Sequence, residues 1–355
     1  MPLHAANNTP VGSDVARVFA KAKDGAPLRF VAFGGSITQS GEGWIGPWLK
    51  EKFPSSHVTI INSGMSATGS ELGVFRIDRD IISHQPDLVA IETCVNDGKL
   101  SDEAAIRYLE SLIVRLRSLP HPPAIFLIEA AAKEGSKLSR HRQVAQHYGL
   151  LEVDLQAAVE AQLQRSGLEW TSLFKDNVHP ADEGHLLYAR TIEQALAPLL
   201  DAKLPASSSE LPAPLSTQPL LLDGRMVPLF GLSNVPGWKR AAAPAFWIDA
   251  FFNGTLAATE PGTTLALPFR GTWVGLLYPM NRSYGSFDVR VDDGGPRRVT
   301  PNTRGGYSFE IVGHDLPPGE HVLRVTLPPA DPSAPGLNGE VRLGYLLLVG
   351  ESSLP

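Results

Sequence analysis

Cysteine, clustered charge and long apolar runs are all scarce in this sequence. Its one cysteine, Cys94, excludes both a disulfide within the chain and a metal site made of several cysteines. The longest apolar runs, such as residues 124–128 and 345–349, are only a few residues long, whereas a membrane-spanning helix needs about 18 residues. We therefore expect no transmembrane helix.

Charge of one sign is scarce as well. The 355 residues include 31 Lys and Arg and 37 Asp and Glu, which gives a net charge of −6. Because no basic block could match a phosphate backbone, nucleic acid is not an expected partner. The first ten residues lack a basic segment followed by an apolar one, so no secretory signal is predicted. This predicts a cytoplasmic protein, or a periplasmic or secreted one if a leader has been removed.

Apolar runs and helical patterns alternate through the first 200 residues. In residues 102–119, for example, apolar residues recur at the 3.6-residue spacing of an amphipathic helix. Alternating β and α units predict a parallel sheet covered on both faces, an α/β fold of three layers. The expected strands are residues 28–34, 58–62, 88–93, 124–129 and 150–154, and the expected helices are residues 44–53, 102–119, 140–148, 155–165 and 180–199.

The pattern changes after residue 200. Residues 201–220 are rich in Pro, Ser and Ala, and we interpret them as a linker between a domain of residues 1–200 and a domain of residues 221–355. In the second domain, short apolar runs are separated by Gly, Pro, Asp and Asn, which is typical of an antiparallel β-sandwich. These runs are residues 265–269, 272–278, 286–291, 307–312, 321–327 and 341–349.

A serine follows the first predicted strand, in the segment FVAFGGSIT of residues 30–38. Ligands of open α/β sheets bind at the carboxyl ends of the strands, and Ser36 lies at such an end. Gly34 and Gly35 allow a tight turn and a close approach of substrate. Ser36 is therefore a candidate nucleophile that needs a base elsewhere; the alternative is an ordinary turn with a serine capping the next helix.

The candidate base is His179, in the segment Asp176-Asn177-Val178-His179-Pro180 near the end of the same domain. The three-residue spacing lets Asp176 turn back onto Nδ1 of His179 while Nε2 points at Ser36. Two alternatives stay open for this pair, namely a metal-binding Asp and His, or a polar cap before the last helix.

Two further strand ends carry candidate donors to an oxyanion. Asn96 follows the strand at residues 88–93, and its side-chain amide could donate to a developing negative charge. Gly64 ends the strand at residues 58–62 and could donate its backbone N–H. Each alone is typical of a tight turn, but with the serine, the acid and the base they complete the set needed for acyl transfer.

These segments resemble the SGNH hydrolases, the family of GDSL-type esterases and lipases. Three residues depart from its usual pattern, with Gly35 in place of Asp, Ser63 in place of Ala and Cys94 in place of Gly. The resemblance covers about residues 27–200. Its blocks are matched in order by Gly34-Gly35-Ser36, Asn62-Ser63-Gly64, Val95-Asn96-Asp97 and Asp176-Asn177-Val178-His179-Pro180.

The resemblance implies a flavodoxin-like sheet and assigns roles to the matching residues. It implies Ser36 as nucleophile, His179 as base and Asp176 as the residue that orients the base. It also implies an oxyanion hole made by the backbone N–H groups of Ser36 and Gly64 and the side chain of Asn96. No cofactor is implied.

Weaker candidates lie around these blocks. Gly35, Thr68 and Arg76 could contact substrate, although Arg76 is also a candidate for a structural ion pair. His141 and His147 are six residues apart, which does not place them on one helix face, so no metal site is predicted.

Aromatic residues of the second domain could stack on sugar rings or form its core. Parts of this domain resemble the β-sandwich that accompanies some carbohydrate esterases, and the domain could bind glycan, wall the active site or join copies of the chain into a homo-oligomer. The aromatic residues are Trp238, Trp247, Trp273, Tyr278, Tyr284 and Tyr307.

We therefore expect a serine esterase that removes O-acetyl groups from a carbohydrate or polysaccharide through an acyl-enzyme. One alternative is a lysophospholipase, thioesterase or arylesterase acting on longer acyl chains. The other is a glycan-binding protein with an inactive hydrolase domain.

Overall fold

The computed structural model describes residues 11–202, 211–243, 251–301, 305–329 and 339–354. The chain forms two compact units, residues 1–222 and residues 223–355. No helix in the described part of the chain is long and apolar enough to cross a membrane. The assignment of residues 1–200, 201–220 and 221–355 to a catalytic domain, a linker and an accessory domain stays a prediction.

A five-stranded parallel sheet forms the centre of the first unit, as the sequence predicts. The strand order is β2-β1-β3-β4-β5. The central strands β3 and β4 are buried along their whole length, which explains their uninterrupted apolar sequences. The strands are β1 (Leu28–Gly34), β2 (Val58–Gly64), β3 (Leu88–Glu92), β4 (Ala124–Glu129) and β5 (Leu151–Asp154).

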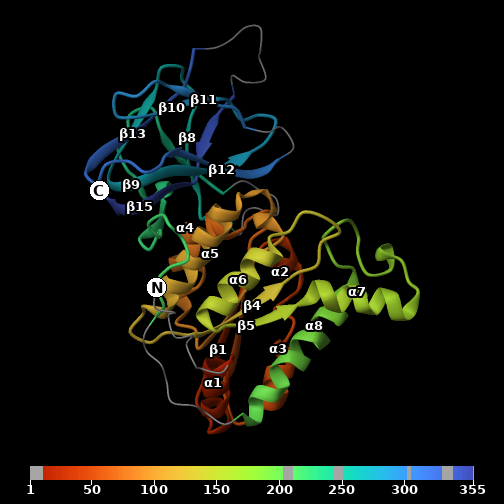
Figure 1. The fold of residues 1–355 in the computed structure, drawn as a ribbon. Helices are drawn as coiled ribbons and strands as arrows, with labels where there is room; N and C mark the ends of the chain where they lie inside the picture. Colours follow the sequence, from red (N-terminus) through yellow and green to blue (C-terminus); the bar gives the residue numbers. More distant parts are fainter. Residues whose placement is uncertain (1–10, 203–210, 244–250, 302–304, 330–338, 355) are drawn as a thin grey trace. The chain divides into compact units, whose positions relative to one another are not determined.

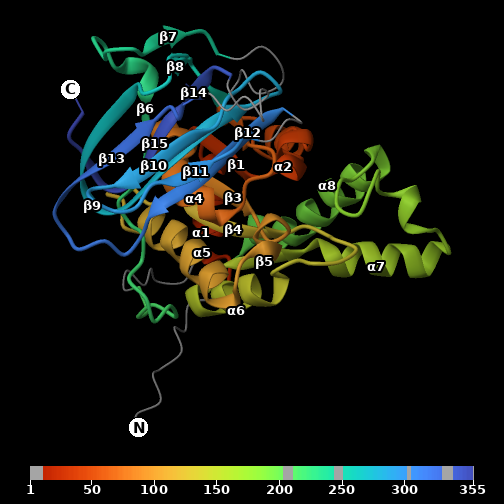
Figure 2. The ribbon, with the colours of Figure 1, turned by 90° about the horizontal axis from the view of Figure 1, so that it is seen from above.

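Helices cover both faces of this sheet (Figures 1 and 2). Residues of α1, α3, α7 and α8 form one core with the strands, while α4, α5 and α6 pack against one another. Three of these helices, α1, α2 and α4, are absent from the sequence prediction. The helices are α1 (Ser13–Lys23), α2 (Ser36–Ser40), α3 (Gly46–Lys52), α4 (Ser70–Asp80), α5 (Asp102–Arg117), α6 (Leu138–Tyr148), α7 (Leu155–Ser166) and α8 (Asp182–Leu196).

Short 3-10 helices connect several of these elements. They are η1 (Ile82–His84), η2 (Asn96–Lys99), η3 (Trp170–Ser172) and η4 (Ala197–Asp201) in the first unit, and η5 (Leu229–Gly231) in the second. The helix expected at residues 180–199 is thus divided, because α8 ends at Leu196 and continues as η4 around Pro198.

Part of the segment read as a linker is held against α5. The buried carboxylate of Glu110 accepts hydrogen bonds from the backbone N–H groups of Leu215 and Ser216. Arg107, one helical turn earlier, donates to the carbonyl of Pro219. Residues 211–222 therefore belong to the first unit, although their composition is that of a loop.

Antiparallel sheets form the second unit, in agreement with the predicted β-sandwich. The larger sheet has the order β11-β10-β13-β9-β15-β6, with β12 also paired to β9, and the smaller one has the order β14-β8-β7. The strands are β6 (Gly224–Pro228), β7 (Lys239–Ala241), β8 (Thr255–Ala258), β9 (Thr264–Met280), β10 (Phe287–Val291), β11 (Arg297–Val299), β12 (Gly306–Gly313), β13 (Glu320–Thr326), β14 (Val341–Leu343) and β15 (Tyr345–Ser352).

The runs at residues 265–269 and 272–278 are one strand, β9, rather than two. It passes through Gly271, opposite an irregularity between Val349 and Gly350 of β15, so the interruption of the apolar pattern at residues 270–271 does not end the strand.

Most of the aromatic residues considered for sugar stacking lie in the core of this unit. Trp238, Trp273, Tyr278 and Tyr284 are all less than 9% exposed, so a core role accounts for them. Tyr307 is partly buried against Phe251 and Phe252 of its own unit. Trp247 lies outside the described residues.

Candidate functional site

Ser36 lies at the carboxyl edge of the parallel sheet, at the first position of α2. Strand β1 ends at Gly34, and Gly35 precedes the helix. A Cβ atom on Gly34 would collide with Oγ1 of Thr38 and with the backbone of Glu92. The sharp strand-to-helix turn that presents Ser36 therefore requires glycine at this position.

Ser36, His179 and Asp176 form a continuous hydrogen-bonded chain. The Ser36 Oγ atom lies 2.7 Å from Nε2 of His179, and Nδ1 of His179 lies 2.7 Å from Oδ2 of Asp176. A carboxylate can only accept at Nδ1, which places the proton there and leaves Nε2 to accept from the serine hydroxyl. Ser36 and His179 are 143 positions apart in sequence, and the fold brings their side chains together.

Asp176 is held in its ionised form by three donors. Its Oδ1 accepts from the backbone N–H groups of Val178 and His179, both at 2.8 Å, and its Oδ2 accepts from the His179 ring. Burial alone would raise the pKa of Asp176, but these hydrogen bonds outweigh burial and lower the pKa to about 2. Asp176 is therefore a carboxylate at neutral pH.

The loop that carries Asp176 and His179 is fixed at both ends. The Lys175 N–H donates to the carbonyl of His179, and Ala181 N–H donates to the carbonyl of Leu173. The indole Nε1 of Trp170 donates to the Asp176 carbonyl at 2.7 Å. These bonds hold the loop in one conformation without using the side chains of the acid and base.

Asn96 lies beside the serine turn. It begins η2, with three residues between it and the end of β3, and a Cβ atom on Gly35 would collide with its amide Nδ2. The amide nitrogen thus packs on the backbone next to Ser36. A side chain at position 35 would therefore displace the Asn96 amide from its place in this structure.

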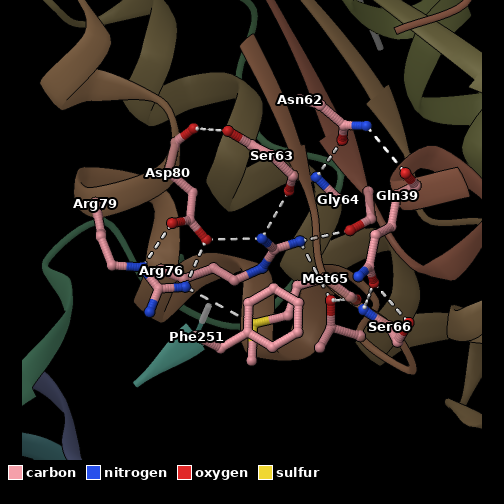
Figure 3. Close-up of polar contacts among 12 residues, drawn as sticks. Gln39, Asn62, Ser63, Gly64, Met65, Ser66, Arg76, Arg79, Asp80 and Phe251 are labelled. Carbon is pink, nitrogen blue, oxygen red and sulfur yellow. Dashed lines mark hydrogen bonds and ion pairs between the residues drawn. The ribbon is translucent and has the colours of Figure 1, made fainter. Parts of the chain in front are cut away.

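The backbone N–H of Gly64, which the resemblance implies as an oxyanion donor, is bonded to a neighbouring side chain in this structure. This N–H donates to Oδ1 of Asn62 at 2.9 Å (Figure 3), and the Asn62 amide donates to the carbonyls of Thr38 and Gln39. The Gly64 N–H is therefore already engaged, and Gly64 could serve an oxyanion only by giving up this bond. In the turn that follows, Ala67 is exposed and has a left-handed backbone with φ of 58°, a rare conformation for a residue with a Cβ.

Thr68 and Arg76, proposed as substrate contacts, are both buried, and this corrects that part of the prediction. Arg76 is fully buried, pairs with Asp80 at 2.7 Å and donates to the carbonyls of Gly34 and Ser63 (Figure 3). Thr68 is 1% exposed and lies 3.2 Å from the Arg76 guanidinium. Arg76 therefore ties the ends of β1 and β2 together, which is the structural role that was the alternative.

Glu92 is a buried carboxylate beneath the serine helix that the sequence reasoning did not single out. Its Oε2 accepts from Thr38 Oγ1 at 2.8 Å and from the Thr38 N–H at 3.3 Å. Burial raises the pKa of Glu92 to about 7, against the opposing effect of hydrogen bonds from Thr38 and from the Gly35 backbone. The sequence feature that could have identified Glu92 is its place as the one charged residue at the end of the apolar strand β3.

His185 supports the other end of α2. Its Nδ1 accepts from Trp44 Nε1 at 3.2 Å, and its Nε2 lies 3.3 Å from Oγ of Ser40. Because an indole N–H can donate only to a neutral ring nitrogen, this bond assigns the proton of His185 to Nε2. His185 therefore contacts the elements around the serine without touching the serine or His179.

The described residues contain no group of three or more His, Cys, Asp or Glu that could hold a metal ion. The Asp176 and His179 pair is directed at Ser36 instead.

Residues 32–187 match the model of the GDSL-like Lipase/Acylhydrolase family. Over nearly its whole length the chain also resembles a solved two-domain esterase (CEX) active on acetylated mannans, co-crystallised with mannopentaose. The identity is 23%, the likeness covers 98% of this chain and 97% of the other, and the TM-score is 0.82. A second structure of a two-domain esterase (CEX) active on acetylated mannans gives 24% identity, 98% and 97% coverage and a TM-score of 0.82. No curated protein matches the chain.

Proposed function

We propose that residues 32–187, which match the model of the GDSL-like lipase/acylhydrolase family, form a domain of that family, and that the protein is a serine esterase that removes O-acetyl groups from a polysaccharide. The observation that carries the proposal is the hydrogen-bonded chain from Ser36 through His179 to Asp176, with both links at 2.7 Å. That arrangement activates a hydroxyl for attack on an ester carbonyl.

In the proposed first step, Ser36 Oγ forms a bond to the ester carbonyl carbon while His179 Nε2 takes the hydroxyl proton. Asp176 stabilises the imidazolium that forms and keeps the ring in place. The carbonyl oxygen becomes an oxyanion, which accepts from the Asn96 amide and the Ser36 N–H. Collapse of this intermediate breaks the bond to the sugar oxygen, which receives the proton from His179.

The second step reverses these roles with water. His179 takes a proton from the water that attacks the acetyl-enzyme, and it returns that proton to Ser36 Oγ as acetate leaves. The proposed residues complete the cycle without a cofactor.

A third oxyanion donor is proposed from the segment after β2. Gly64 is the residue that the family resemblance implies, but its N–H is bonded to Asn62. The left-handed, exposed turn at Ala67 offers a backbone N–H a few residues further on. We assign the role to this turn and expect Gly64 to contribute by holding it, together with Asn62.

Acetylated polysaccharide is proposed as substrate because the chain shares both of its domains with an esterase active on acetylated mannans. The C-terminal domain contributes none of the proposed reacting groups, so recruitment of polymer is the role we assign to it. Its assembly into homo-oligomers and the compartment of the protein stay predictions.

Hydrolysis of p-nitrophenyl esters from acetate to palmitate, followed by acetate release from acetylated mannan, tests the proposal. Wild type, Ser36→Ala and the control Ser40→Ala should be compared. We expect serine-dependent activity that is highest on acetate and is retained in Ser40→Ala.

Three results would contradict this proposal in different ways. Rates that rise with chain length would indicate the lipase-like alternative. Binding of acetylated mannan without turnover would indicate a glycan-binding protein with an inactive hydrolase domain. Activity that survives Ser36→Ala would refute the assigned nucleophile.

A further inference from the structure

His141 of α6 is buried between two carboxylates that the proposed reaction does not use. Its Nε2 lies 3.0 Å from Oδ2 of Asp97, and its Nδ1 lies 3.4 Å from Oε1 of Glu129 at the end of β4. All three side chains are no more than 1% exposed. Burial alone would lower the pKa of His141, but Glu129 and Asp97 outweigh it and raise the pKa to about 10. His141 is therefore an imidazolium at neutral pH, with its Nε2 hydrogen-bonded to Asp97 and its Nδ1 within ion-pair distance of Glu129.

The Asp97 carboxylate joins this histidine to the start of α4. Its Oδ1 accepts from the Ser70 N–H at 2.7 Å, and its Oδ2 accepts from Ser70 Oγ at 2.7 Å. A Cβ atom on Gly69 would collide with Oδ1. Asp97 thus fastens η2 to the end of the turn that contains Ala67, the two segments assigned to the oxyanion hole.

Asn96 precedes Asp97 in η2, so the position of its amide depends on how this short helix is held. The Asp97 N–H donates to the carbonyl of Thr93 at 2.9 Å, and the carbonyl of Asp97 accepts from Leu100. A short 3-10 helix has too few internal bonds to hold itself. The Asp97 side chain supplies the long-range anchor, and His141 is its partner from the neighbouring helix.

We propose that His141 is a positioning residue for the oxyanion hole, which holds the Asp97 carboxylate and through it the Asn96 amide over Gly35. This inference rests on the proposed function and deepens it. Oxyanion donors act by being in place before charge develops, so a small displacement of the amide lowers turnover more than ester binding.

The test is a double-mutant cycle between His141 and Asn96 on p-nitrophenyl acetate. His141→Ala should lower kcat about 10- to 100-fold, the usual effect of losing an outer partner of a site, and change KM less than about twofold. His141→Gln retains an N–H for Asp97 and should recover most of the lost kcat. His147→Gln is the control on the same helix: His147 bonds to the carbonyl of Ala213 and packs against the Tyr148 ring, and the kcat of this variant should equal that of wild type.

The cycle separates positioning from a general effect on folding. In an Asn96→Ala background, His141→Ala should cause no further loss of kcat, because the group that it positions is gone. An unchanged kcat in the single variant, or the same loss in both backgrounds, would overturn the proposal. If His141→Ala does not fold, Ser70→Ala, which removes one donor to Asp97, replaces it in the cycle with a smaller expected loss.

A structural measurement distinguishes this proposal from the proposed function. Absence of any Ser36-dependent esterase activity would refute the function, yet the positioning claim is still measured by the crystal structure of the His141→Ala or Ser70→Ala variant. We expect the Asn96 amide to leave its contact with Gly35. An amide in its original place would overturn the inference.

Discussion

Replacing Glu92 by Gln should stabilise the protein by an amount that grows with pH. Glu92 is fully buried, and its pKa is raised from 4.5 to about 7 in the folded state. The folded protein therefore holds a proton that the unfolded chain has lost between these pH values, so this group lowers stability as pH rises. At about 1.4 kcal/mol per pH unit, the cost reaches about 3 kcal/mol above pH 7.

Glutamine has the same shape but no charge to bury. Its amide oxygen can accept the hydrogen bonds from Thr38 that Glu92 accepts. The free energy of unfolding of Glu92→Gln should thus be close to that of wild type near pH 4.5 and exceed it by about 3 kcal/mol at pH 8.

Urea unfolding of both proteins at intervals between pH 4.5 and pH 8 measures this difference. Other titrating groups are common to both proteins and cancel. Glu160→Gln on the exposed surface of α7 is the matched control for the loss of a carboxylate outside the core. A gap between wild type and Glu92→Gln that is constant with pH, or that narrows as pH rises, would refute the assignment of a buried carboxyl that titrates near neutrality.

Three further predictions concern the site and the end of the first compact unit. Asn96→Ala should lower kcat on p-nitrophenyl acetate by about 10²–10³ with little effect on unfolding, and near-normal turnover would remove Asn96 from the site. Asp176→Asn should lower kcat by about 10³–10⁴ because the amide favours the wrong tautomer of the base, and a loss smaller than tenfold would show that the imidazole is oriented by other means. A chain of residues 1–222 should unfold cooperatively and hydrolyse p-nitrophenyl acetate. A chain of residues 1–210 should be less stable, because the buried Glu110 carboxylate loses two backbone donors, which costs about 1–3 kcal/mol. Equal urea midpoints for the two chains would contradict this.

The sequence predicts the parallel sheet and the triad because the signals for both are local. Buried strands such as β3 and β4 are continuous apolar runs, and a parallel sheet brings their carboxyl ends to one edge. Asp176 and His179 are three residues apart, so their hydrogen bond is set by one turn of chain. The contact between His179 and Ser36 then follows if all three residues lie at the carboxyl edge of the sheet.

The corrections concern contacts between residues far apart in sequence. Arg76 reads as a polar residue after a site glycine, and only the fold places carbonyls of β1 and β2 around its guanidinium. The engagement of the Gly64 N–H depends on the orientation of the Asn62 side chain, which a strand pattern does not specify. Glu110 likewise binds the backbone of Leu215, 105 residues away, in a segment whose composition is that of a loop.

The central claim is that Ser36 is a nucleophile activated by His179. Reaction with a fluorophosphonate, which phosphonylates activated serines, followed by peptide mass mapping, tests it without knowledge of the natural substrate. We expect one phosphonyl group per chain, on Ser36, and no adduct in His179→Ala. An adduct on another serine, or labelling of Ser36 that is as fast without His179, would contradict it.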